Sequence, residues 1–164
     1  MSARNSKTLS EVPVKEVSAT HTSRGLYFYG AVALLSLIGL GDAIYLTVKH
    51  VTGGIVPCTL SGGCEQVLNS SYATIGGIPL ALLGALAYFT VFSLAILAAF
   101  GNKPAGTLLF YQVLLMLAVS IWLFILQAFV IHAYCQFCLL SAAITLLLFL
   151  IVAAQRLLPK FRRK

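Results

Sequence analysis

Four long apolar stretches dominate the pattern of hydrophobic and polar positions along this chain of 164 residues. Each stretch covers the roughly 20 residues that an α-helix needs to cross the hydrocarbon core of a bilayer. Charged residues almost never interrupt them, so the pattern predicts transmembrane helices rather than the elements of a soluble domain. The predicted spans are residues 26–48, 78–100, 107–131 and 134–158.

The polar segments around these stretches are too short to form a second domain. Residues 1–25 are polar and mixed in charge, and we expect them to be a disordered cytoplasmic tail. A loop of residues 49–74 separates the first two spans, and residues 159–164 form a basic cytoplasmic tail. We therefore predict an all-α integral membrane bundle of four helices over residues 26–158, with one extracytoplasmic loop between the first and second helices.

Composition supports a membrane protein, since 60% of the residues are hydrophobic and only 9% are charged. A soluble domain of this size cannot cover so much apolar surface. Taken alone, the formal net charge of +7 would be compatible with nucleic-acid binding. However, the basic residues lie in the tails and short connections rather than along a folded face, so we expect no nucleic-acid partner.

The positions of these basic residues instead predict the orientation of the bundle, because Lys and Arg are retained in the cytoplasm. The tails and the connection between the second and third spans carry Arg4, Lys7, Lys15, Arg24, Lys103, Arg156, Lys160, Arg162, Arg163 and Lys164. The opposite side carries only Lys49. Both termini are therefore predicted to be cytoplasmic, and the 49–74 loop and the turn before the fourth span to lie outside.

All four cysteines fall on this predicted outer side, where an oxidising compartment lets thiols pair and exchange. Cys58 and Cys64 lie in the loop, and the glycines between them permit a tight return. Cys135 and Cys138 form a CxxC motif at the outer start of the fourth span, an i, i+3 pair on one helical face. A helix N-terminus stabilises a thiolate and lowers the pKa of a cysteine there, which favours redox exchange.

Three complete pairings of four cysteines are possible, and the spacing alone does not select one. Two inert structural disulfides would suit a membrane scaffold that binds partners, although a CxxC on a helix forms a strained ring better suited to exchange. A zinc site is disfavoured because five residues separate Cys58 from Cys64, rather than about two to four. We therefore favour a redox relay, meaning an ordered series of thiol–disulfide exchanges, and expect no metal site.

Three segments of the chain resemble bacterial homologues of vitamin K epoxide reductase. They are the runs GDAIYLT at 41–47, CEQVLNSSYAT at 64–74 and GIPLALLG at 77–84. The order of the cysteine pairs is also similar, with a loop pair first and a CxxC in the fourth span. Because these features extend from the first span to the fourth, they are far more specific than a lone CxxC.

This resemblance implies a membrane thiol oxidoreductase that passes electrons to a quinone, such as menaquinone or ubiquinone, in the bacterial cytoplasmic membrane. Cys135 and Cys138 match the active-site pair of the family, and Cys58 and Cys64 match its loop shuttle pair. Ser70 matches a serine near the quinone headgroup. The implied electron donor is a separate extracytoplasmic thioredoxin-like or DsbA-like protein, whose oxidation would support disulfide bond formation.

The relay implied by this resemblance runs inward from the loop. Cys64 attacks Cys135, and Cys138 is released as a thiolate that faces the quinone. The animal enzymes carry a tyrosine where this chain has Ala142, and this departure counts against vitamin K epoxide as the natural substrate. Reduction of a vitamin K-like quinone or epoxide is therefore the alternative reaction.

Two other polar residues have weaker functional signals. Asp42 near the outer end of the first span needs a partner, because an unpaired charge in a membrane is costly. Asp42 could donate a proton or a hydrogen bond near the quinone. Alternatively, it could form an ion pair or a hydrogen bond that connects the first span to the outer loop, and the sequence does not distinguish these two roles. His132 precedes the CxxC, and we expect it to be a solvated interfacial side chain.

Overall fold

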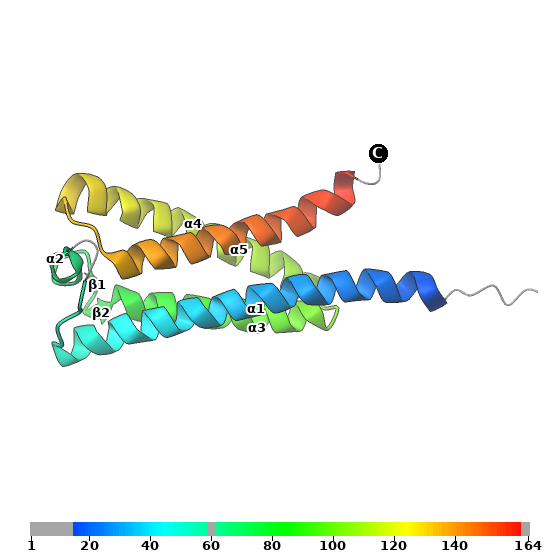
Figure 1. Cartoon of the computed structure of the whole chain (residues 1–164), viewed down its shortest axis with the longest axis horizontal. Helices are drawn as coiled ribbons and strands as arrows, with labels where there is room; N and C mark the ends of the chain where they lie inside the picture. The colour runs from blue at the N-terminus through cyan, green and yellow to red at the C-terminus, as the bar shows by residue number, and fades with distance from the viewer. Residues whose placement is uncertain (1–14, 59–61, 162–164) are drawn as a thin grey trace, which may run out of the picture.

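Four long helices run alongside one another in the computed structural model, which describes residues 15–58 and 62–161 (Figure 1). They are α1 (Lys15–Thr52), α3 (Leu80–Ala99), α4 (Lys103–Ile125) and α5 (Gln136–Phe161). A π-helical turn, η1 (Leu126–Ile131), continues α4. The connection between α1 and α3 contains the short helix α2 (Cys64–Leu68) and an antiparallel pair of strands, β1 (Thr74–Ile75) and β2 (Ile78–Pro79).

The long helices form a closed ring of neighbours. α1 packs against α3 and α5, and α4 packs against the same two helices from the other side. The connection containing α2, β1 and β2 lies at the same end of the bundle as the connection between α4 and α5 (Figure 1). The first turn of α1 and the last turn of α5 lie at the opposite end, so the cysteine-bearing segments meet far from both ends of the described chain (Figure 1).

Each long helix contains a segment that is long and apolar enough to cross a membrane. These segments are Leu26–Thr52, Leu80–Ala99, Pro104–Ile131 and Gln136–Leu157. Many of their large apolar side chains point away from the bundle and are exposed. This is the arrangement that lipid requires, and it agrees with the predicted all-α membrane bundle.

Several boundaries differ from the prediction by a few residues, and two of the differences change the assigned structure. Helix α1 begins at Lys15, so residues 15–25 are helical rather than disordered. Once a span is formed, each further residue adds one helical hydrogen bond, and no proline interrupts this stretch. The second span begins at Leu80 rather than at residue 78, because Ile78 and Pro79 pair as a strand. Residues 1–14 and 162–164 of the two predicted tails lie outside the described residues.

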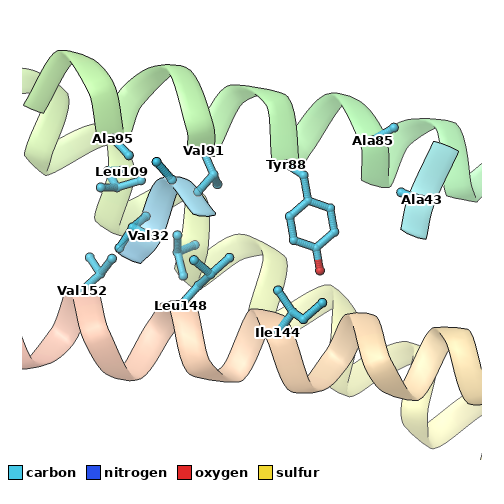
Figure 2. Close-up of a cluster of buried hydrophobic side chains, with 12 residues drawn as sticks. Val32, Ala43, Ala85, Tyr88, Val91, Ala95, Leu109, Ile144, Leu148 and Val152 are labelled. Carbon is cyan, nitrogen blue, oxygen red and sulfur yellow. The ribbon is translucent and has the colours of Figure 1, made fainter. Parts of the chain in front are cut away.

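Among the described residues, Tyr88 of α3 is the largest fully buried side chain, and it joins three helices. Its hydroxyl group lies 2.9 Å from the carbonyl oxygen of Ser141 and 3.0 Å from the hydroxyl oxygen of Thr145, both on α5. The ring occupies space that a Cβ atom at Gly39 of α1 would need. Figure 2 shows the ring reaching from α3 toward α5 among apolar neighbours such as Ile144. The tyrosine therefore fixes the helix spacing directly beside the candidate site, with its hydroxyl satisfied as burial requires.

Candidate functional site

The loop cysteines form a disulfide at the end of the bundle. Cys58 and Cys64 are joined across a Cα–Cα distance of 6.0 Å. Cys64 is the first residue of α2 and is fully buried, whereas Cys58 is half-buried. Cys64 shares a buried cluster with Cys135, although the two are far apart in the sequence. The fold thus brings the inner loop cysteine to the CxxC motif.

Gly63 explains how this close approach is possible. A Cβ atom at this position would lie 2.9 Å from both the backbone nitrogen and the backbone oxygen of Tyr134. Real Cβ atoms do not approach backbone atoms so closely, so any larger residue would push the loop away. The absence of a side chain before Cys64 therefore lets α2 begin directly beside Cys135.

Replacing Gly63 with alanine should slow the exchange between the two cysteine pairs by about tenfold, since small displacements of reacting atoms are costly. The test uses a background with Cys58→Ala and Cys138→Ala, in which Cys64 and Cys135 are the remaining cysteines. Their rate of disulfide formation under a mild oxidant is followed by mass spectrometry of nonreduced peptides. Gly54→Ala is the matched control, because its Cβ would meet the movable Lys49 side chain. Equal rates in both variants would contradict the proposed contact.

The CxxC motif begins just before α5 rather than inside it. Cys135 occupies the capping position, and its sulfur accepts a hydrogen bond from the backbone N–H of Cys138 at 3.4 Å. The thiol group of Cys138 also donates to this sulfur, and that bond lowers the pKa of Cys135 to about 7 although burial opposes the shift. Both cysteines carry free thiols. The stabilised thiolate that the motif predicts is therefore on Cys135.

A cavity of about 140 Å³ lies beneath the loop, between the four long helices. Its wall is mainly apolar, with side chains such as Leu46, Leu80, Leu123 and Leu139. The residues with polar groups on the wall are Asp42, His50, Ser70, Tyr72, Ser120, Gln127, Cys138 and Ser141. An apolar cavity of about 150 Å³ accepts a benzene ring, and a few polar groups on such a wall can orient a ligand. The residues present therefore fit the headgroup of a quinone.

The other residues singled out in the sequence lie at different distances from this cavity. Ser70 is on its wall, and its hydroxyl group donates to the carbonyl oxygen of Val67 at 2.7 Å. Asp42 is also on the wall, and its Oδ2 atom is buried without a hydrogen-bond partner among the described residues. Ala142 lies on the wall as well. His132 is exposed and is not part of the wall, as expected for an interfacial side chain.

Gln127 is a site residue that the sequence analysis missed. It is only 4% exposed, it lies on the cavity wall, and its Oε1 atom accepts the backbone N–H of Cys135 at 3.0 Å. The available signal was an amide in the middle of an apolar span, where polar side chains are costly and usually have a partner. The hydrogen-bond partner of the Gln127 amide is determined by the π-helical turn, and no sequence pattern predicted that turn.

Comparison with known proteins agrees with this geometry. The model of the vitamin K epoxide reductase family matches residues 30–153, which include all four cysteines and the whole cavity wall. The chain belongs to the vitamin K epoxide reductase family. This confirms, at the level of the family, the resemblance seen in the three sequence segments.

One protein whose sequence is similar to this chain is the thiol-disulfide oxidoreductase LTO1 of Arabidopsis thaliana. It is 34% identical to this chain over 117 residues. The matched region covers 66% of this chain but only 31% of that protein. The chain therefore spans about a third of the length of this relative.

Proposed function

We propose that this protein is a membrane thiol–disulfide oxidoreductase that takes electrons from a thioredoxin-fold protein and delivers them to a quinone. The observation that supports this most is the line of sulfur groups from the loop to the cavity. The Cys58–Cys64 disulfide lies at the end of the bundle, Cys64 and Cys135 share one buried cluster, and Cys138 lies on the cavity wall. We further propose that the protein is in a bacterial cytoplasmic membrane, with both termini inside and the cysteines outside.

The electron transfer into the CxxC pair is a series of exchanges that conserves thiols and disulfides. A thiolate of the reduced donor attacks Cys58, and the freed Cys64 attacks Cys135 of an oxidised CxxC pair, releasing Cys138. The second thiol of the donor then displaces Cys58, which attacks Cys64 and re-forms the loop disulfide. The donor leaves as a disulfide, and both Cys135 and Cys138 are reduced. The loop disulfide next to the thiols of Cys135 and Cys138 supports this proposed order.

The CxxC pair then becomes a disulfide again and gives up two electrons. A quinone held in the cavity would supply the acceptor chemistry, since its reduction to a hydroquinone takes two electrons and two protons. Cys138 is the member of the pair on the cavity wall, so its sulfur delivers the electrons while the thiolate of Cys135 bonds to it. The Cys138 thiol supplies one proton. When Cys135 is already a thiolate, the second proton has to come from another group.

Asp42 is placed to supply this second proton, because it is a carboxyl group on the cavity wall with a buried oxygen that has no hydrogen-bond partner among the described residues. It can regain a proton through His50, which lies about two helical turns further along α1. His50 lies on the wall of this cavity and also on the wall of a smaller cavity formed with Lys49, Glu65 and Asn69 at the end of the bundle. These two side chains therefore connect the cavity with the loop side of the bundle.

Replacing Asp42 with asparagine should lower the turnover of quinone by about a hundredfold, because asparagine keeps the size and hydrogen bonding of aspartate but cannot deliver a proton. Turnover is measured from the absorbance of a short-chain quinone, with dithiothreitol as the electron donor. Ser120→Ala, which removes another polar group from the same wall, should change turnover only slightly. Normal turnover in Asp42→Asn would exclude Asp42 as the proton source.

The order of the relay is tested by removing Cys138. In Cys138→Ala the thiol that resolves the Cys64–Cys135 bond is absent, so this mixed disulfide should accumulate when the protein is oxidised. Mass spectrometry of nonreduced peptides identifies the two cysteines, with the wild-type protein as the control. A Cys58–Cys135 disulfide in its place would reverse the order of the loop cysteines.

A scaffold with two static disulfides is less compatible with the site. Such a scaffold needs no ligand cavity beside its cysteines, whereas Cys138 lies on the wall of one. Reduction of a vitamin K-like quinone or epoxide would use the same cavity and the same pair, so it differs from the proposed reaction only in the ligand.

A further inference from the structure

The segment between α4 and α5 is held by hydrogen bonds to a single residue, Gln127. Gln127 accepts three backbone hydrogen bonds from this segment, and the first of them runs from the N–H of His132 to its carbonyl oxygen. Its carbonyl oxygen also accepts the N–H of Ala133 at 3.2 Å, and its side-chain Oε1 atom accepts the N–H of Cys135 at 3.0 Å. One residue of the π-helical turn therefore holds both the chain before the CxxC motif and the first cysteine of the motif.

Two uncommon backbone features accompany these bonds. The turn Leu126–Ile131 is a π-helix, and His132 directly after it has a left-handed conformation with a φ angle of 54°. Both conformations are unfavourable for most sequences and persist only where the surrounding structure holds them, often at functional sites. Gln127 is also almost completely buried. The local structure is therefore organised to bring this amide to the backbone of Cys135.

We propose that Gln127 is a positioning residue that fixes Cys135 at the start of α5 and so keeps the sulfur of Cys135 on the N–H of Cys138. The N–H of Cys135 is buried with its residue, and it has no helical acceptor because α5 begins at Gln136. Without the amide oxygen it would be a buried donor with no partner, and the segment would have to move to satisfy it. That movement would separate the sulfur of Cys135 from the end of α5.

This inference rests on the proposed function only in treating Cys135 as the redox-active thiolate, and its test needs no quinone. The full chain is reduced with dithiothreitol in lipid nanodiscs, freed of reductant and treated with iodoacetamide at a series of pH values. Mass spectrometry gives the alkylation rate of Cys135, and the midpoint of its pH dependence reports the ionisation of this thiol. In Gln127→Met, which keeps the side-chain volume but removes the acceptor, the midpoint should rise by about one pH unit.

Gln155→Met is the matched control, because Gln155 is a partly buried glutamine of α5 far along the helix from the CxxC motif. Its midpoint should equal that of the wild-type protein. Gln127→Asn is a second variant in case the methionine variant does not fold, since its shorter amide cannot reach Cys135 and should give the same rise. An unchanged midpoint in a folded Gln127 variant, or an equal rise in Gln155→Met, would overturn the positioning role.

Discussion

Replacing either Cys135 or Cys138 with alanine should abolish quinone reduction with every electron donor, whether a protein or a small dithiol. The two thiols are hydrogen-bonded to each other and Cys138 lies on the cavity wall, and a disulfide between them is the product that accounts for both electrons. Neither cysteine alone can close that disulfide. The expected loss of turnover is at least about a thousandfold, as for the removal of a reacting group from an enzyme.

The measurement follows the absorbance of a short-chain quinone with dithiothreitol, which bypasses the loop. Cys58→Ala is the matched control, because it makes the same change at a cysteine that is not on the cavity wall. That variant should still reduce the quinone. Substantial turnover in either CxxC variant would show that the electrons leave through some other group, and the proposed function would then be wrong.

Variants of the loop pair should separate electron donors by size. Cys58→Ala or Cys64→Ala should lower turnover with a thioredoxin-fold donor by about a hundredfold or more, while turnover with dithiothreitol stays within about threefold of the wild type. The reason is access. Cys135 is fully buried against the loop, so a protein donor cannot reach it, whereas a small dithiol can enter the cavity and meet the partly exposed Cys138.

The two donors are compared in the same preparation, so that a folding defect lowers both rates and a shuttle defect lowers only one. Ser71→Ala, an exposed change in the same loop, is the control and should leave both rates unaltered. Equal losses with both donors would mean that the loop cysteines serve the stability of the site. Full activity with the protein donor would mean that the loop pair is bypassed.

The spans and the cysteine pairs could be predicted because each depends on local composition. A run of about 20 apolar residues identifies a membrane helix without knowledge of its neighbours. The two pairs were apparent from their spacing, from the glycines around Cys58 and Cys64, and from the position of Cys135 and Cys138 at the end of a span. The structure confirms that the spans are helical and places both pairs at one end of the bundle.

The features of the site that could not be predicted from the sequence depend on contacts between segments that are distant along the chain. Gln127 becomes important only because a π-helical turn brings its amide to Cys135, and Gly63 only because the loop lies against Tyr134. The cavity likewise needs side chains from all four long helices. The sequence suggested a disordered stretch at residues 15–25 because its polar composition outweighed the tendency of a membrane helix to extend.

Both ends of the described chain lie away from the cysteines, at the far end of the bundle (Figure 1). Helix α1 has 38 residues and helix α5 has 26, which correspond to roughly 57 and 39 Å at about 1.5 Å per residue. A protein module attached at either end of the described chain therefore begins roughly 40 Å or more from the loop disulfide. Such a module can meet Cys58 only if the linking chain crosses the bilayer an odd number of additional times. An even number, including zero, leaves it on the wrong side. An electron donor can therefore be covalently linked to this bundle only when the number of additional membrane spans is odd. With an even number of additional spans, the donor has to reach the loop disulfide by diffusion.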